Sequence, residues 1–166
     1  MALGWGEGEL KHLFRAYLRM LQDELAGRSY SKVEYNREVP SNPKEPDDAS
    51  PVREYVIVRT GGFTSDGTAT VNKRGWAYKP TIEMIVACKS PDQVGAALFS
   101  LLDRIDALIC QDRRLGFPQG SGMIDAQIES GEPDPIDAAG SSPGGALIVE
   151  VVAKLQTTRT RLSAAA

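Results

Sequence analysis

"WAYKPTIEMIVAC" (residues 76–88) and "SPDQVGAALFSLLDRIDALIC" (residues 90–110) are separated by one residue. The first segment is rich in β-branched and aromatic residues and is typical of a strand. Pro80 cannot donate a ladder hydrogen bond, so it belongs at a sheet edge or near the start of that strand. The second segment repeats apolar residues at three- and four-residue spacing, which indicates an amphipathic helix. A strand that leads directly into a helix predicts a domain built from both kinds of element.

The start of this helix carries a capping pattern. Ser90 is a suitable N-cap residue, Pro91 suits the first helical position, and Gln93 completes a capping box. The apolar face that we expect to be buried consists of Val94, Ala97, Leu98, Leu101, Leu102, Ile105, Leu108 and Ile109.

The rest of the chain adds one helix and three strands around this unit. Apolar residues between 10 and 25 form a helical stripe. Strands are expected over 53–60, 122–130 and 146–158 because these segments are β-branched or alternate between apolar and polar residues. The connections are a long proline-rich loop over 28–52, a turn-rich hairpin arm over 61–75 and a loose C-terminal tail over 159–166.

The order helix, strand, strand, helix, strand, strand predicts an α/β (α+β) domain over residues 1–166. We expect a four-stranded antiparallel or mixed sheet with two helices packed on one face. A chain of 166 residues with 42% hydrophobic residues is long enough for one domain with its own core.

Composition excludes several classes of protein. The formal net charge of −3 argues against a dedicated nucleic-acid binder. No apolar run is long enough to span a bilayer, and the first residues lack the pattern of a secretory signal, so we expect a cytoplasmic site of synthesis. Two cysteines, Cys88 and Cys110, make no disulfide framework and are read as small hydrophobes.

The stretch "GGFTSDGTA" (residues 61–69) superficially resembles a phosphate-binding loop because four residues separate Gly62 from Gly67. Such a loop requires a lysine and a serine or threonine directly after the second glycine, followed by a helix. Here Thr68 and Ala69 follow Gly67, and the next residues have no helical stripe. The glycines are therefore interpreted as turn formers in a hairpin connection, and no cofactor is expected.

No convincing catalytic or metal-binding set emerges. His12 is the only histidine and faces away from the stripe of its helix. The carboxylates Glu129, Glu132, Asp134 and Asp137 have no regular spacing and no supporting histidine or cysteine, so a solvated turn is the better interpretation. Lys73 and Arg74, with Trp76 and Tyr78, could contact nucleic acid, but the shoulder of a hairpin is favoured. We predict that the chain is not an enzyme.

Alternation along the strands predicts a second sheet face of mixed character. In the strand over 76–88, Ile82, Met84, Val86 and Cys88 share one face, and in the last strand Leu147, Val149, Val151, Ala153 and Leu155 do the same. The opposite face carries apolar and charged residues together, which suits contact with another subunit as well as scattered surface hydrophobes. The residues that we single out on this face are Glu83, Ile85, Asp125, Glu129, Ile148, Glu150 and Val152.

The order of elements, together with "LKHLFRAYLRML", "REYVIVRTGG", "WAYKPTIEMIVACKSPDQVGAALFSLLDRIDAL" and "GMIDAQIES…GGALIVEVVAKLQ", resembles the tail terminator proteins of lambda-like long-tailed bacteriophages. The resemblance covers roughly residues 10–157 and rests on pattern and order. It implies a small non-enzymatic virion protein that forms a homo-oligomeric, typically hexameric, ring. Such a ring caps the tail tube, ends its polymerisation and provides the surface that joins the head.

This resemblance implies a set of partners and a location. The partners are the chain itself, the tail tube protein and a head–tail connector protein, while DNA only passes through the lumen. The location is the virion tail, after assembly in the host cytoplasm. The long loop over 28–52 and the tail after Thr158 depart from the family pattern and leave the type of tail open. The hairpin arm becomes a candidate assembly arm, with Gly61, Gly62, Phe63, Asp66, Gly67, Lys73 and Arg74 as its candidate residues.

Two alternatives stay open. One is another head–tail connector or tail-completion ring protein with a similar small domain. The other, of a different class, is a small ligand-binding or enzymatic α/β domain, which would require a pocket with convergent polar groups. On the ring hypothesis, the mixed sheet face either lines the lumen, where its carboxylates would repel DNA weakly, or contacts the neighbouring subunit.

Overall fold

The centre of the molecule is a long antiparallel hairpin, which consists of β2 (Val52–Ala69) and β3 (Lys73–Cys88). The computed structural model describes residues 31–35, 44–69, 73–111, 113–114, 123–134 and 142–158. β5 (Gly144–Thr158) pairs antiparallel with β3, and β4 (Met123–Asp134) pairs antiparallel with β5. β1 (Ser31–Tyr35) adds to the free side of β2 as a parallel strand. The described residues thus form a mixed five-stranded sheet in the order β1-β2-β3-β5-β4.

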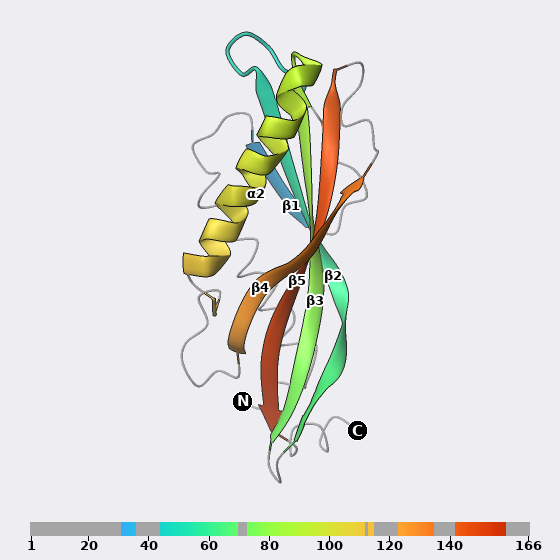
Figure 1. The fold of residues 1–166 in the computed structure, drawn as a ribbon, viewed down its shortest axis with the longest axis vertical. Helices are drawn as coiled ribbons and strands as arrows, with labels where there is room; N and C mark the ends of the chain where they lie inside the picture. The colour runs from blue at the N-terminus through green and yellow to red at the C-terminus, as the bar shows by residue number, and fades with distance from the viewer. Residues whose placement is uncertain are drawn as a thin grey trace.

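The helix α2 (Val94–Gln111) packs on one face of this strongly twisted sheet, as Figure 1 shows. Leu101, Ile105 and Ile109 are the buried side chains of the helix. They pack against the residues of β2, β3, β4 and β5 that the strand alternation directs to the same side. The buried sheet residues of this core are Val56, Val58, Tyr78, Ile82, Met84, Val86, Cys88, Ala126, Val149, Val151 and Ala153.

The start of the helical region differs from the capping box expected from the sequence. Residues Pro91–Gln93 form a short 3-10 helix, and the α-helix begins only at Val94. Ser90 occupies the N-cap position without a side-chain capping hydrogen bond, while the backbone N–H of Gln93 donates to its carbonyl oxygen at 3.2 Å. The tighter first turn therefore satisfies this backbone donor in place of the Ser90 hydroxyl.

The expected arrangement of four strands and two helices is wrong, although the class remains α+β. The sheet has five strands, and α2 is the one α-helix among the described residues. The fifth strand is β1, which lies inside the segment 28–52 that we expected to be loop. Its sequence, SKVEY, is too short for its pattern to predict a strand. The segment is a strand because it pairs with β2. The helix expected over 10–25, the residue His12 and the tail over 159–166 lie outside the described residues.

The prediction of a turn-rich insert is also wrong for residues 61–69. They continue β2, and the pairs run from Gly62 with Lys79 to Ala69 with Arg74. One register irregularity precedes Gly62, and a second lies between Ser65 and Ala69. β3 pairs on its other side with β5 as far as Lys73 with Thr158. Backbone hydrogen bonding on both sides of β3 outweighs the weak strand propensity of the glycines and serine. Figure 1 shows that this three-stranded end of the sheet continues well beyond α2.

Candidate assembly surface

The sheet face opposite α2 gathers the mixed residues predicted from the sequence. Alternation places Glu83 and Ile85 of β3 and Ile148, Glu150 and Val152 of β5 on this face. The register sets Glu83 beside Ile148. Part of the face is buried, because Tyr55, Ile57, Ile85 and Ala146 form a second apolar cluster there. The exposed part therefore lies toward β4 and the end of β5.

Glu83 belongs to the buried part of this face. It is only 1% exposed, and its carboxylate forms an ion pair with the guanidinium of Arg59 on the adjacent strand. A buried carboxylate requires such a partner because desolvation of an isolated charge is very unfavourable. In the single chain the charge of Glu83 thus neutralises the charge of Arg59, and Glu83 adds no carboxylate to the surface.

Lys79 forms the polar centre of the exposed part. Its ammonium lies 3.4 Å from Glu129 of β4 and 3.4 Å from Glu150 of β5. The hydrogen bond to Glu129, helped by the charges of Glu129 and Glu150, raises the pKa of Lys79 above its ordinary value. Glu129 sits at a register irregularity between Ile128 and Ser130, which bends the edge strand β4. One lysine is therefore shared by two carboxylates.

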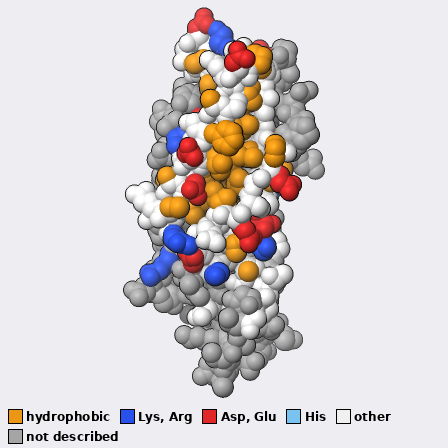
Figure 2. Space-filling model, in the orientation of Figure 1, with side chains coloured by type: hydrophobic (Ala, Val, Ile, Leu, Met, Phe, Trp, Pro, Cys, Tyr) orange, Lys and Arg blue, Asp and Glu red, His pale blue; other side chains and the backbone are white. Residues whose placement is uncertain are grey.

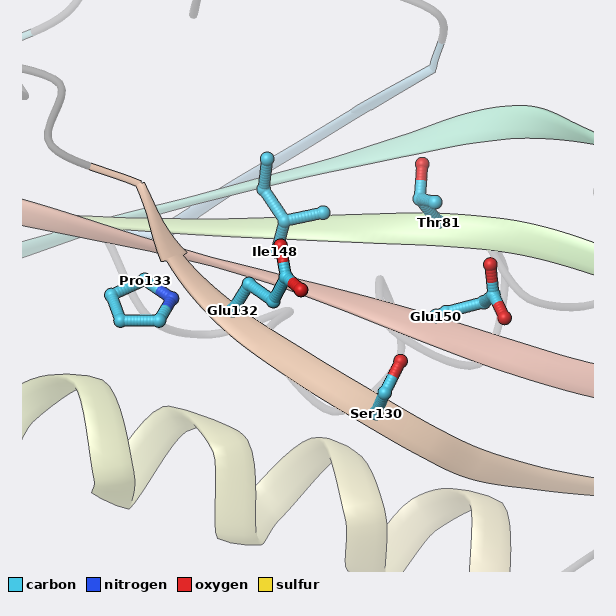
Figure 3. Close-up of a pocket in the computed structure, with 6 residues that line it drawn as sticks. All are labelled: Thr81, Ser130, Glu132, Pro133, Ile148 and Glu150. Carbon is cyan, nitrogen blue, oxygen red and sulfur yellow. The ribbon is translucent and has the colours of Figure 1, made fainter.

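A hollow of about 440 Å³ lies next to this cluster. Ile148 and Pro133 supply apolar walls, and the hydroxyls of Thr81 and Ser130 and the carboxylates of Glu132 and Glu150 line the rest. Figure 3 shows Thr81, Ile148 and Glu150 pointing away from α2, so the hollow opens on the mixed face. No described cation lies within ion-pair distance of Glu132. The hollow therefore presents net negative charge beside a small apolar surface.

Two further candidates of the face lie outside the hollow. Asp125 pairs with Arg113, which follows the end of α2, with an N···O distance of 2.5 Å, and Arg113 also donates to the side-chain oxygen of Gln127 at 3.2 Å. This contact ties β4 to the end of the helix. Val152 is buried and lies opposite Gln127 in the register. Neither residue takes part in the hollow.

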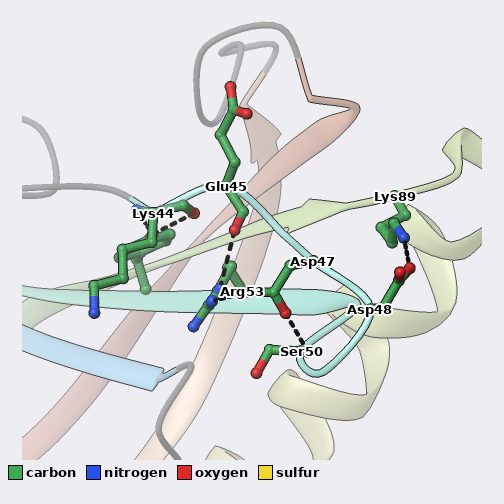
Figure 4. A network of polar contacts seen from close by, with 8 residues as sticks. Lys44, Glu45, Asp47, Asp48, Ser50, Arg53 and Lys89 are labelled. Atoms are coloured by element: carbon green, nitrogen blue, oxygen red, sulfur yellow. Dashed lines mark hydrogen bonds and ion pairs between the residues drawn. The ribbon is translucent and has the colours of Figure 1, made fainter.

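Residues 44–50, which precede β2, are bound to the sheet by polar contacts that the sequence did not predict (Figure 4). The hydroxyl of Tyr55 accepts from the backbone N–H of Lys44 at 2.6 Å and donates to its carbonyl oxygen at 3.0 Å. Arg53 donates to the Glu45 carbonyl oxygen and to the Asp47 carboxylate, each at 3.2 Å. These bonds satisfy the polar ends of two side chains that are otherwise buried.

The hydrogen bond and charge of Lys89 lower the pKa of Asp48 in the same segment. Residues 44–50 form no helix or strand, and they are anchored at both the start of β2 and the end of β3. Only their proline, aspartate and serine content was visible in the sequence.

Apolar side chains gather on the helix side of the molecule, as Figure 2 shows. Phe99 is 65% exposed on the outer side of α2 and is the exposed large hydrophobic residue of the described chain. Leu98, Leu102, Leu147 and Ile128 are half-buried against the core. Nothing among the described residues covers Phe99.

The candidate residues of the assembly arm lie on two paired strands. Gly61, Gly62, Phe63, Asp66 and Gly67 belong to β2, and Lys73 and Arg74 begin β3. Gly67 has a φ of 82°, which favours glycine. Arm and hollow are thus separate places on one sheet, and whether either takes part in assembly stays a prediction.

Within the described ranges no group of three or more histidine, cysteine, aspartate or glutamate residues could hold a metal ion. The helices in this part of the chain are too short or too polar to cross a membrane.

A further ion pair, between Arg104 of α2 and Glu54 of β2, joins the helix to the sheet. Sequence reasoning missed this pair and the pair of Arg59 with Glu83, because each joins residues that are far apart in the chain.

Comparison with known proteins finds an informative similarity, which is to a solved structure. No protein-family model matches the sequence, and no curated protein matches it. Among solved structures, a chain from the "Virion of native gene transfer agent (GTA) particle" is similar, with a TM-score of 0.52 and 12% sequence identity. The match covers 87% of this chain and 95% of that chain. At this identity the similarity shows a shared fold over almost the full length of both chains.

Proposed function

We propose that this chain is a structural protein of a phage-like virion, and more specifically the ring protein that caps the tail tube. The observation that carries the proposal is the fold shared over nearly the whole length with a chain of a gene transfer agent virion. The resemblance of the sequence to tail terminators supports the finer role independently, because it rests on residue patterns. The match to a virion chain also favours a non-enzymatic role.

In this role the chain would assemble with itself into a ring, typically a hexamer. One side of the ring would contact the last layer of the tail tube protein and stop its growth, and the other side would meet a head–tail connector protein. A tube grows because each layer offers the same two complementary sides. A terminator ends the growth because one of its sides differs. The long three-stranded end formed by β2, β3 and β5 is the part best shaped to reach a neighbouring molecule.

The surface that we propose for the lumen or a subunit contact is smaller than the sequence alone indicated. Glu83 is buried, so of the carboxylates predicted for the mixed face only Asp125, Glu129 and Glu150 remain accessible. If they line the lumen, their charge discourages DNA from binding while it passes. If they lie between subunits, they must meet positive charge on the neighbour.

The test has two steps. Light scattering of the purified chain after gel filtration should give a mass of several subunits, and negative-stain electron microscopy should show rings with a central hole. The ring should then be added to growing tail tubes of the same virion, where capped tubes should stop lengthening. A monomer at all concentrations would overturn the proposal. Rings that bind a connector protein and leave tube growth unchanged would favour the alternative of a connector or tail-completion ring.

A further inference from the structure

The mixed face carries opposite charges at two separate positions along β5. The first position is the acidic hollow described above, which Glu132 and Glu150 line together with Ile148. Lys79 contacts both Glu150 and Glu129 and compensates part of this charge. Glu132 is exposed and forms no ion pair with a described residue. The hollow therefore keeps an uncompensated carboxylate.

The second position is Lys154, whose side chain is exposed. Alternation along β5 directs it to the same face as Ile148 and Glu150. The register sets Asp125 of β4 opposite Lys154, but the carboxylate of Asp125 already pairs with Arg113. Within the described ranges Lys154 has no ion-pair partner of its own. Its ammonium is therefore available to a carboxylate of another molecule.

Lys154 cannot reach Glu132 within its own chain. The register sets Glu132 opposite Ile148, six residues from Lys154 along β5. Six residues of a strand span roughly 20 Å, which exceeds the combined length of a lysine and a glutamate side chain. β5 pairs with β3 on one side and with β4 on the other, so the two ladders keep this separation fixed. These two opposite charges can meet only between two molecules.

We propose that Lys154 of one copy of this chain enters the acidic hollow of a second copy. Ile148 and Pro133 offer an apolar wall to the aliphatic stem of the lysine, and Glu132 and Glu150 receive its charge. The hollow suits such a side chain because it combines an apolar surface with an excess of negative charge. This inference rests on the proposed ring and names one contact between its subunits.

The contact is heterologous, because the hollow and Lys154 are different surfaces. The sheet twists strongly along its length (Figure 1), so the two surfaces point in different directions. A copy whose lysine occupies the hollow of one neighbour therefore leaves its own hollow open to another neighbour. Repetition of such a contact closes a ring when the rotation permits it.

Chemical cross-linking tests the contact in the unaltered chain. A carbodiimide joins a lysine to a carboxylate only where the two are in contact, and mass spectrometry identifies the linked peptides. In rings assembled from labelled and unlabelled chains, Lys154 should link to Glu132 or Glu150 of a chain with the other label. Lys79 and Glu129 provide the internal reference, because they lie 3.4 Å apart in one chain and should link only peptides with the same label.

Charge reversal tests the same contact by its strength. Glu132→Lys and Lys154→Glu should each weaken self-association by more than about tenfold, because like charges then meet at every contact of the ring. Light scattering over a range of concentrations measures this change. The matched controls are Asp106→Lys on the exposed side of α2 and Lys44→Glu before β2. Each control alters the net charge equally and should leave the ring intact.

Rescue distinguishes a direct contact from a general effect of charge. An equimolar mixture of Glu132→Lys and Lys154→Glu chains should reassemble by alternation, which a ring with an even number of subunits permits. A chain that carries both changes should also reassemble, since opposite charges again meet across the contact. Circular dichroism checks that each variant is folded. Glu132→Gln and Lys154→Gln replace the reversals if a reversal prevents folding, and each should weaken association in the same direction.

The outcomes separate the two proposals. If the unaltered chain stays a monomer, the ring itself fails. If rings form and the reference link appears without a link from Lys154 to the hollow of another chain, the ring stands and this contact is wrong. Reversals that leave the ring intact, or that weaken it without rescue in the mixture, also overturn the contact.

Discussion

At the scale of single residues, the ion pair of Arg59 and Glu83 joins the two central strands. Glu83 is 1% exposed, while the side chain of Arg59 is 29% exposed. We expect Arg59→Met to lower the free energy of unfolding by about 3–5 kcal/mol, because it leaves a buried carboxylate without its cation. Urea unfolding followed by circular dichroism measures this value.

The double change Arg59→Met with Glu83→Met is the matched comparison. It removes both charges, so it should restore most of the loss, and the cycle of single and double variants isolates the pair from other contacts of Arg59. Equal destabilisation by the single and double changes would contradict a paired buried charge.

The two cysteines should differ in reactivity. Cys88 is fully buried, and this burial, helped by the charge of Glu54, raises the pKa of its thiol. Cys110 is exposed near the end of α2. Because the thiolate is the reactive form, a thiol reagent should label Cys110 in the native protein, and Cys88 only after unfolding. Equal labelling rates in the folded protein, measured by mass spectrometry, would show that the core opens readily around β3.

At the scale of elements, α2 organises the core through one face. Leu101 is fully buried at its centre, so Leu101→Ala should lower the free energy of unfolding by about 2–5 kcal/mol, the cost of a cavity in a packed core. Phe99→Ala on the exposed side of the same helix is the control and should change the stability of the monomer by less than about 0.5 kcal/mol. If the two changes cost the same in thermal or urea unfolding, the helix is wrongly oriented.

The entry into the long hairpin depends on a close approach of backbones at Gly61. A Cβ atom at this position would overlap the carbonyl group of Lys79 on β3, whereas a Cβ at Gly62 would meet no atom within 4 Å. Gly61→Ala should therefore destabilise the hairpin by about 1–3 kcal/mol, because the strands must separate to admit the methyl group. Gly62→Ala should be nearly neutral. Hydrogen exchange of the amides after residue 61 would reveal the local opening, and equal protection in both variants would count against it.

At the scale of the whole molecule, assembly should appear as a concentration-dependent melting temperature. A partner that binds only the folded state adds stability by mass action, so a roughly hundredfold rise in protein concentration adds up to about 2.7 kcal/mol for one association step. We expect the Tm of the unaltered chain to rise with concentration in scanning calorimetry. A constant Tm over this range would indicate that the folded chain does not associate.

Residue patterns predicted some of these features and missed others for reasons visible in particular segments. The period of residues 94–109 predicted the buried face of α2, and Leu101, Ile105 and Ile109 are buried as expected. The alternation in β3 and β5 predicted which residues share the core. β1 escaped prediction because five residues carry little pattern, and Gly61–Ala69 were misread because glycine and serine usually mark turns.

The sequence by itself determined the faces of the long elements, because the burial of an amphipathic helix or strand follows from its own period. It also determined the excess of acidic over basic residues, a formal net charge of −3. Only the tertiary structure decided which charges are buried in pairs, such as Glu83 with Arg59, and which remain on the surface around the hollow. The physical reason is that ion pairs and pockets form between strands distant in the chain, and the register that joins them is set by packing of the whole sheet.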